Sequence, residues 1–363
     1  MTILLFVLGL VGLITGAELF LKAVDHFGLK WGVSPLIMGL TVVAFATGAP
    51  ELAISIKAAF SGSADLVLGN IIGSNIANIL LILGITAIIS PINITRRVIR
   101  IDVPIVITIS VVVYLMSIDG GLSTVDGVIL LMGFLAYSYF TYVQIKNNSN
   151  EEEKEGETFQ YHLSPDELEK GTFFYIKNGG LLLIGLALIV LGSNWIVDSA
   201  VIIARILGLS ELVIGLTIIS IGTSLPEVAT SLSAARKGNA DIAVANVMGS
   251  NLYNVLLTLA LTLIIAPNVL EVSKDAITLD LPFMVLVSMA CIPIFIAGFN
   301  LTRVDGALFL SYYVTYLTYL VLNAINSPIV STMQGVILYA AIPLTILYMM
   351  WRIYVHRTSI AEF

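Results

Sequence analysis

The sequence predicts an all-α membrane protein that consists of two inverted five-helix repeats and an extra C-terminal membrane helix. Three observations support this fold class. Of the 363 residues, 58% are hydrophobic and only 11% are charged, whereas water-soluble domains have about 25% charged residues. A polar motif occurs twice in an otherwise apolar chain. Each copy lies within a group of five predicted spans, and an odd number of spans inserts the two copies in opposite orientations.

A membrane-spanning helix needs about 20 predominantly apolar residues, and eleven segments of the chain meet this requirement. The predicted spans are residues 2–24, 33–60, 65–91, 99–118, 124–146, 177–200, 209–236, 240–266, 277–298, 303–323 and 329–351. The corresponding organisation is a first repeat over 1–146, an acidic loop over 147–176, a second repeat over 177–323, and an extra helix with a short tail over 324–363.

The motif at residues 39–80 returns at residues 215–256 with a constant shift of 176 residues. Many identical residues align in the two copies without a gap, and eleven of these pairs are mostly polar, glycine or proline. The aligned pairs are Gly39 and Gly215, Thr41 and Thr217, Thr47 and Thr223, Pro50 and Pro226, Glu51 and Glu227, Asp65 and Asp241, Asn70 and Asn246, Gly73 and Gly249, Ser74 and Ser250, Asn75 and Asn251, and Asn78 and Asn254. Later pairs, such as Asp102 and Asp280, align at shifts of 178 and 179 residues. The chain is therefore predicted to be a duplicated membrane unit.

Basic residues predict the orientation of the chain, because cytoplasmic loops carry an excess of lysine and arginine. If the N-terminus lies outside, only Lys57, Arg205 and Lys274 of the 17 basic residues fall on the outer side. This orientation places the acidic 147–176 loop and the C-terminus in the cytoplasm.

Each copy of the motif has a proline directly before its glutamate. Pro226 lacks an N–H group, so the carbonyl of Gly222 loses its helical partner, and Pro50 has the same effect on Ala46. An unsatisfied carbonyl in hydrocarbon costs several kcal/mol. The expected solution is a local helix break that lines a cavity, where the freed carbonyl can face a cation.

A threonine lies four residues before each glutamate, on the same predicted helix face. The pairs are Thr47 with Glu51 and Thr223 with Glu227. Hydroxyl, carbonyl and carboxylate oxygens are hard ligands that suit Ca²⁺ or Na⁺ better than zinc or copper. A packed, protonated structural glutamate is the alternative for either position, but two equivalent glutamates with the same hydroxyl neighbour disfavour it.

The helix that follows each glutamate carries a stripe of polar residues at four-residue spacing. The stripes consist of Asn70, Ser74 and Asn78 in the first copy and Asn246, Ser250 and Asn254 in the second. Such a stripe should face a cavity or a partner helix rather than lipid. Ion binding and interhelical hydrogen bonding are both compatible with this pattern.

With these motifs the chain resembles the cation/Ca²⁺ exchanger superfamily, and within it the prokaryotic type of the Na⁺/Ca²⁺ exchanger branch. The resemblance rests on Gly222-Thr-Ser-Leu-Pro-Glu227 and the stretch 245–254, with their first-copy counterparts, and it covers roughly residues 1–323. It implies alternating access around an ion cluster at the membrane midplane. The implied ligands of the transported ions are Glu51, Glu227, Thr47, Thr223, Ser224, Ser74, Ser250, Asn78 and Asn254, together with the backbone carbonyls of Ala44 and Ser220.

Two features depart from the family pattern. Gly48 stands where the family usually has serine, so one side-chain oxygen is missing opposite Ser224. The predicted span at 329–351 lies beyond the usual ten spans. The resemblance also implies independence from K⁺, because K⁺-dependent members typically have an aspartate where this chain has Asn254.

The sequence therefore predicts an antiporter that exports Ca²⁺ against an inward flow of Na⁺. Its two carboxylates can balance one Ca²⁺ or hold Na⁺ ions with help from neutral oxygens. A Ca²⁺/H⁺ exchanger is the alternative, because buried glutamates can carry protons; a cation channel fits the paired motifs less well. No enzymatic activity, cofactor or nucleic-acid partner is expected. The expected partners are Ca²⁺, Na⁺ and the lipid bilayer, and a monomer is sufficient.

Overall fold

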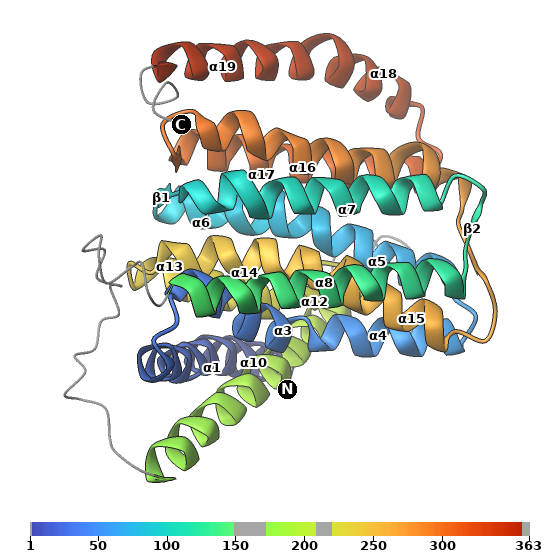
Figure 1. Cartoon of the computed structure of the whole chain (residues 1–363). Coiled ribbons are helices and arrows are strands. Elements are labelled where there is room, and N and C mark those ends of the chain that lie inside the picture. Colours follow the sequence, from blue (N-terminus) through green and yellow to red (C-terminus); the bar gives the residue numbers. More distant parts are fainter. Residues whose placement is uncertain (1, 149–171, 208–219, 358–363) are drawn as a thin grey trace.

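The computed structural model describes residues 2–148, 172–207 and 220–357, which form a bundle of long helices (Figure 1). Within this described part, nine helices are long and apolar enough to cross a membrane. The helix pair Pro35–Thr47 and Ala49–Phe60, which meets at a bend of 41°, adds a tenth possible span. The expectation of a multi-span helical membrane protein is therefore confirmed.

The first half of the chain begins with one long helix and continues with helices that are interrupted by π-helical segments (η). Its elements are α1 (Thr2–Trp31), α2 (Pro35–Met38), η1 (Gly39–Val43), α3 (Ala44–Thr47), α4 (Ala49–Phe60), α5 (Ala64–Ala77), η2 (Asn78–Leu83), α6 (Gly84–Ile89), β1 (Ile92–Asn93), η3 (Val98–Asp102), α7 (Val103–Met116), β2 (Gly121–Leu122) and α8 (Thr124–Asn148). Because π-helical turns are rare and occur often at functional sites, the segment that begins at Asn78 marks a region of interest.

The second half repeats this order. Its elements are α10 (Thr172–Ile206), α12 (Ser220–Thr223), α13 (Leu225–Arg236), α14 (Ala240–Tyr253), η6 (Asn254–Leu259), α15 (Ala260–Ile265), β3 (Leu270–Glu271), η7 (Ala276–Asp280), α16 (Leu281–Ile296), β4 (Asn300–Leu301), α17 (Arg303–Ala324), α18 (Ile329–Val336), η8 (Ile337–Ala341) and α19 (Ile342–Val355). The π-helical segment η6 begins at Asn254, as η2 begins at the equivalent Asn78.

The structure changes two predicted boundaries. Helix α10 begins at Thr172 and α8 continues to Asn148, so both extend into the predicted 147–176 loop. The start of α10 is the apolar run Phe173–Ile176, which continues the helical pattern of the span that follows. The rest of the acidic loop lies outside the described residues, as do residues 209–219 of the seventh predicted span.

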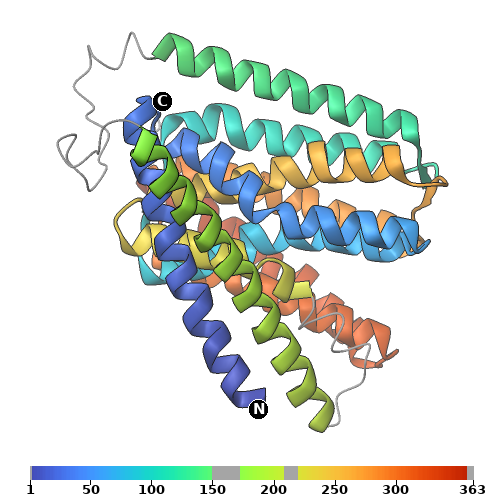
Figure 2. The ribbon, with the colours of Figure 1, turned by 90° about the horizontal axis from the view of Figure 1, so that it is seen from below.

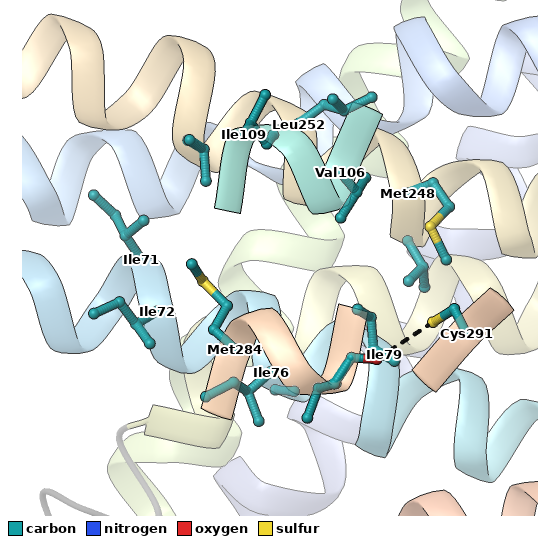
Figure 3. Close-up of a cluster of buried hydrophobic side chains, with 14 of the residues drawn as sticks. Ile71, Ile72, Ile76, Ile79, Val106, Ile109, Met248, Leu252, Met284 and Cys291 are labelled. Atoms are coloured by element: carbon teal, nitrogen blue, oxygen red, sulfur yellow. Dashed lines mark hydrogen bonds between the residues drawn. The ribbon is translucent and has the colours of Figure 1, made fainter. Parts of the chain in front are cut away.

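The two helices that carry the polar stripes form the centre of the bundle. The comparison uses the most apolar stretch of each span. In that stretch 83% of the residues are buried for Ala64–Ile89 and 72% for Ala240–Ile265. For the C-terminal span Ile329–Val355 the buried share is only 6%. Figure 3 shows how the apolar faces of these central helices meet α7 and α16, with Ile76, Val106 and Met284 among the packed side chains. The stripe helices are therefore placed away from lipid.

Each strand contact between a first-half element and a second-half element has a counterpart in which the equivalent elements have changed places. Strand β1 pairs with β4, with Ile92 opposite Leu301, and β2 pairs with β3, with Leu122 opposite Leu270. Under the repeat shifts, Ile92 corresponds to Leu270 and Leu122 corresponds to Leu301. Each pairing is thus the image of the other, which is the contact pattern of a two-fold relationship.

Glycines allow α1 and α10 to lie backbone against backbone along their length (Figure 2). A methyl group added at Gly9 would meet the Gly192 carbonyl oxygen at 2.8 Å, and one added at Gly16 would meet the Gly185 carbonyl oxygen at 2.8 Å. Small residues that let helices approach closely are the usual basis of helix association in membranes. The two contacts are equivalent under the repeat. Gly9 corresponds to Gly185 and Gly16 to Gly192, so the Gly9–Gly192 contact is the counterpart of the Gly185–Gly16 contact.

The C-terminal helix α18–η8–α19 lies at the edge of the bundle beside α16 and α17, opposite α1 and α10 (Figure 1). Its buried anchor is Arg352, which is 3% exposed and forms an ion pair with Asp305 of α17. Arg352 also donates to Asn300 Oδ1 at 2.8 Å, and the Tyr348 hydroxyl donates to Asp305 at 2.8 Å. Hydrogen bonds between the Tyr312 hydroxyl and Thr345 Oγ1 at 2.7 Å and from Gln334 Nε2 to the Tyr319 hydroxyl at 3.0 Å also join this weakly buried helix to α17.

We predict that Gly185→Val destabilises the protein, because the new side chain would meet the backbone of α1, where a methyl group would lie 2.6 Å from Phe20 N. Overpacking of this kind costs about 1–3 kcal/mol. Gly180→Val is the matched control in the same helix, since nothing in the described structure lies within 4 Å of a methyl group at Gly180. Thermal unfolding in detergent measures the difference, and equal melting temperatures for the two variants would contradict the close α1–α10 contact.

Candidate functional site

The helix breaks next to the two glutamates have the same local structure. Helix α3 ends at Thr47 and α4 begins at Ala49, with Gly48 between them at φ −77° and ψ −2°. In the second copy Ser224 occupies the break at φ −89° and ψ 5°. Each proline lies in the first turn of the new helix, where its missing N–H is tolerated.

Both glutamates consequently lie in the first turn of a helix, at the end where the helix dipole favours negative charge. Glu51 is 1% exposed and Glu227 is 2% exposed. The two carboxylates are close enough for their charges to interact, and the Thr47 hydroxyl lies beside the Glu227 carboxylate. Because an isolated buried carboxylate is very unfavourable, this pair of side chains calls for a compensating positive charge.

The site concentrates buried oxygen atoms that have no partner. Of the fifteen such buried polar atoms found in the described part of the chain, eight belong to residues predicted as ion ligands. These eight atoms are Glu51 Oε1 and Oε2, Ser74 Oγ, Asn78 Oδ1, Ser224 Oγ, Glu227 Oε2, Ser250 Oγ and Asn254 Oδ1. Leaving a buried polar group unpaired costs about 1–3 kcal/mol. Their accumulation at one place indicates a site whose partners come from outside the chain.

The amide groups of Asn78 and Asn254 are oriented by the opposite repeat. Asn78 Nδ2 donates to Asn251 Oδ1 at 2.8 Å, and Asn254 Nδ2 donates to Asn75 Oδ1 at 3.2 Å. Because these hydrogen bonds fix the amide nitrogens of Asn78 and Asn254, the Oδ1 atoms of the same side chains point away from Asn251 and Asn75. Asn75 and Asn251 were not predicted to belong to the site, although their identity in the two copies was a signal for it.

The remaining amides of the two stripes hold the glutamate helices in place. Asn70 Nδ2 donates to the Glu51 carbonyl at 3.1 Å and to Ser55 Oγ at 2.9 Å. Asn246 Nδ2 donates to the Glu227 carbonyl at 3.4 Å, and also to Ser231 Oγ, the equivalent of Ser55, at 2.9 Å. The stripe thus serves two purposes, since its first asparagine bonds between helices and its later members supply unpaired oxygens.

The other predicted ligands have less uniform surroundings. Thr47 Oγ1 donates to the Val43 carbonyl at 3.1 Å and contacts Asn246 Oδ1 at 3.3 Å. The Ala44 carbonyl accepts the N–H of Gly48 at 3.0 Å, which leaves a second lone pair. Thr223 lines two cavities beside the break.

Carbonyls near the second break accept hydrogen bonds from within the chain. The Gly222 carbonyl, which Pro226 frees from the helix, accepts a hydrogen bond from Ser193 Oγ of α10 at 3.0 Å, which leaves its second lone pair for another partner. The Ser224 N–H donates to the Ile221 carbonyl at 3.1 Å, three residues back. The break therefore tightens its last turn around Ile221.

The arrangement can coordinate hard cations by carboxylate, hydroxyl, amide and carbonyl oxygens. Among the described residues, no group of three or more His, Cys, Asp and Glu side chains is positioned to hold a metal ion. Only two carboxylates act at this site, which suits reversible binding of one divalent or a few monovalent cations. The fold and the site together describe a membrane protein with a cluster of buried oxygens that have no hydrogen-bond partner in the described structure.

Comparison with known proteins gives the family. The sodium/calcium exchanger protein family model matches residues 1–143 and 177–322. The chain is 30% identical over 346 residues to the sodium/calcium exchanger MaX1 of Methanosarcina acetivorans, which covers 87% of this chain and 97% of the relative. It is 36% identical over 292 residues to the inner membrane protein YrbG of Escherichia coli, which covers 78% of this chain and 86% of the relative.

A solved structure of the sodium-calcium exchanger NCX_Mj superimposes with a TM-score of 0.73 at 30% sequence identity and covers 88% of this chain and 98% of that chain. The protein belongs to the sodium/calcium exchanger family, as its paired motifs predict. It is a multi-pass membrane cation exchanger, and its relatives are transporters rather than enzymes.

We predict that Gly48→Ser tightens Ca²⁺ binding. A Cβ atom at position 48 would lie 4.0 Å from the unpaired Asn254 Oδ1, so a serine hydroxyl there would join the oxygen cluster. A neutral hydrogen-bonding group contributes about 0.5–1.5 kcal/mol net, which corresponds to roughly a 2- to 10-fold gain in affinity.

The matched control is Gly48→Ala, which adds the same Cβ atom next to the Ala44 carbonyl, 3.1 Å away, without the hydroxyl. Equilibrium binding of radioactive Ca²⁺ to purified protein measures both variants. Equal affinities for the serine and alanine variants would show that position 48 does not contribute an ion ligand.

Proposed function

We propose that this protein is a Na⁺/Ca²⁺ antiporter that exports Ca²⁺ by alternating access and does not require K⁺. The observation that carries this proposal is the cluster of eight unpaired buried oxygens around Glu51 and Glu227. Its ligands are the predicted side chains of both repeats, with the carbonyls of Ala44 and Ser220 at the outer positions. The names of MaX1 and NCX_Mj, both sodium/calcium exchangers, agree with this assignment.

Charge balance explains how one cluster can exchange two ions. Two carboxylates carry a charge of about −2, which one Ca²⁺ neutralises and which two or more Na⁺ can also neutralise with neutral oxygens as additional ligands. Because both ions need the same carboxylates, they bind in competition. Each elementary charge that crosses 100 mV is worth about 2.3 kcal/mol, so an inward Na⁺ gradient can drive Ca²⁺ outward.

An inverted repeat supplies the two alternating states. The support for this topology is the exchange of contacts between the halves, from the strand pairs to the Gly9–Gly192 and Gly16–Gly185 contacts of α1 and α10. In this proposal residues 1–146 and 177–323 are the two repeats. The motion that alternates access is a displacement of the tightly packed α1–α10 pair relative to the ion cluster.

The orientation of the proposed transporter follows the distribution of basic residues. The N-terminus lies outside and the 147–176 loop lies in the cytoplasm. The helix at Ile329–Val355 is an additional membrane span, attached through Arg352, with its tail inside. The protomer contains the complete cluster, so a monomer is sufficient for transport.

Exchange of Ca²⁺ for H⁺ is the second candidate. Glu51 has two carboxylate oxygens without a hydrogen-bond partner in the described structure, and Glu227 has one. Such groups can take up a proton in place of a cation. Ca²⁺ uptake into proteoliposomes with imposed Na⁺ or H⁺ gradients separates the candidates, since only the gradient of the coupled ion drives accumulation.

We predict that Glu51→Gln and Glu227→Gln each abolish Ca²⁺ exchange without unfolding the protein. Each change removes half of the negative charge of the cluster, and the amide keeps the shape of the side chain. Glu18→Gln, on the exposed face of α1, is the control. Ca²⁺ flux in proteoliposomes is the measurement; near-native exchange by either site variant would mean that the carboxylates are not ion ligands.

We predict that exchange does not require K⁺. Asn78 and Asn254 contribute neutral amide oxygens, so the two glutamates are the sole carboxylates, and K⁺ added to bound Ca²⁺ would leave excess positive charge in a low-dielectric site. Na⁺-driven Ca²⁺ flux should be equal in choline medium and in K⁺ medium. Asn254→Asp, which adds a third carboxylate, is the variant expected to change this result, and a strict need for K⁺ in the native protein would contradict it.

A further inference from the structure

Arginine residues gather around the strand pair β1–β4, at the end of the bundle where α16 turns into α17. Strand β1 lies at this end and β2 at the opposite end (Figure 1). The Ile94 N–H donates to the Phe299 carbonyl at 2.7 Å, which extends the pairing into the turn. Segments 92–101 and 297–304, which surround this strand pair, contain four arginines and no aspartate or glutamate. The four are Arg96, Arg97, Arg100 and Arg303.

The equivalent strand pair β2–β3 carries the opposite charge. Its segments 270–279 and 118–125 correspond to 92–101 and 297–304 under the repeat shifts, and the structure describes all four segments. They contain one lysine and three acidic residues, namely Lys274, Asp119, Glu271 and Asp275. The same structural element is therefore strongly positive at one end of the bundle only.

Phe299, at the centre of the basic turn, has an unusual backbone conformation. Its φ of 51° lies in the left-handed region, which a bulky residue occupies only at a cost in free energy. The equivalent residue is Gly120, which takes a φ of 89° without a steric penalty. The Phe299 ring lies under the guanidinium of Arg96, with 5.7 Å between Arg96 Cζ and the ring centroid. The ring therefore holds this guanidinium in a defined position.

The C-terminal span brings a second stacked arginine to the same turn. Arg352 donates to a backbone carbonyl of the turn at 2.6 Å. The His356 ring packs on Gly298, where an added Cβ atom would lie 2.7 Å from it. These contacts bring the next residue, Arg357, to the turn, and its Cζ lies 5.0 Å from the centroid of the Tyr354 ring. Two different elements thus each supply an arginine that is stacked on an aromatic ring.

Exposed apolar side chains border these arginines. Trp351 is 59% exposed and Tyr354 is 65% exposed on the C-terminal span, and Val304 of α17 is 62% exposed. On a membrane-spanning helix such side chains contact lipid, and Trp and Tyr are enriched at the level of the headgroups. A ligand at this turn therefore meets guanidinium groups next to a surface that suits acyl chains.

We propose that a basic patch, formed by Arg96, Arg97, Arg303 and Arg357, binds the phosphate of an anionic phospholipid, and that the C-terminal span completes this lipid site. A guanidinium binds a phosphate through two parallel N–H···O bonds, and the cation–π contacts position two of the guanidinium groups in advance.

The general excess of basic residues on the cytoplasmic side accounts for the sign of the patch. It does not account for a phenylalanine at positive φ where the other repeat has glycine, or for the second arginine that the C-terminal span adds. In the proposed orientation the patch faces the cytoplasmic leaflet, which is rich in anionic lipids. The lipid site does not depend on which ions the protein exchanges.

Lipid binding to the purified protein in detergent tests the proposal. The probes are phosphatidylglycerol, phosphatidylcholine with the same acyl chains, and inorganic phosphate, and native mass spectrometry counts the bound lipid. The native protein should bind phosphatidylglycerol in preference to phosphatidylcholine, and inorganic phosphate at the same concentration should not displace it. Equal binding of the two lipids, or displacement by inorganic phosphate, would overturn the proposal.

The double variant Arg96→Gln/Arg357→Gln should bind phosphatidylglycerol roughly 25-fold more weakly, because each arginine near an anionic headgroup contributes a factor of about 5. Both side chains are exposed, so their loss should leave the fold intact. The matched control is Lys57→Gln/Lys274→Gln, which removes two exposed positive charges from the other end of the bundle and should bind like the native protein. Equal losses in the two double variants would mean that overall charge decides binding, and the site would be refuted.

A second variant tests the role of the guanidinium groups at constant charge. Arg96→Lys/Arg357→Lys keeps both positive charges but removes the planar groups that stack and bind phosphate through two donors. Phosphatidylglycerol binding severalfold weaker than in the native protein would support the proposed contacts. Native affinity in this lysine variant would contradict recognition by stacked arginines.

Discussion

The structure depends on keeping negatively charged and polar oxygens unpaired inside a membrane protein. Two ionised carboxylates in the first turns of α4 and α13 are unfavourable in this buried place unless a cation or a proton neutralises them. Other features hold this cluster ready: Asn70 and Asn246 tie the glutamate helices to the stripe helices, and Asn75 and Asn251 orient the neighbouring amides. The chain satisfies its own polar groups around the cluster, and the oxygens of the cluster itself have no hydrogen-bond partner in the described structure.

The repeat provides this arrangement twice. The hydrogen bonds of Asn78 and Asn254 are images of each other, as are the strand pairs at the two ends of the bundle. The equivalent contacts of the two halves support the alternating access of the proposed antiporter.

The sequence was sufficient for the features that depend on local pattern. Apolar length predicted the spans, and the repeat predicted the equivalence of the halves. The Pro–Glu pairs predicted local helix breaks, which the structure places at Gly48 and Ser224. Features that depend on distant contacts could not be predicted. The hydroxyl of Ser193 on the Gly222 carbonyl and the Arg352 anchor on Asp305 each join residues far apart in the chain. The roles of Asn75 and Asn251 also became clear only when the two stripe helices were placed side by side.

The most direct measurement of the central claim is equilibrium binding of radioactive Ca²⁺ to the purified protein at increasing Na⁺ concentration. A cluster with two carboxylates should bind one tightly held Ca²⁺ per chain, and Na⁺ should displace it with a cooperative dependence because several Na⁺ replace one Ca²⁺. Choline at the same ionic strength should not displace it. Ca²⁺ binding that is unaffected by Na⁺, or displaced equally by choline, would contradict a shared site for the two ions.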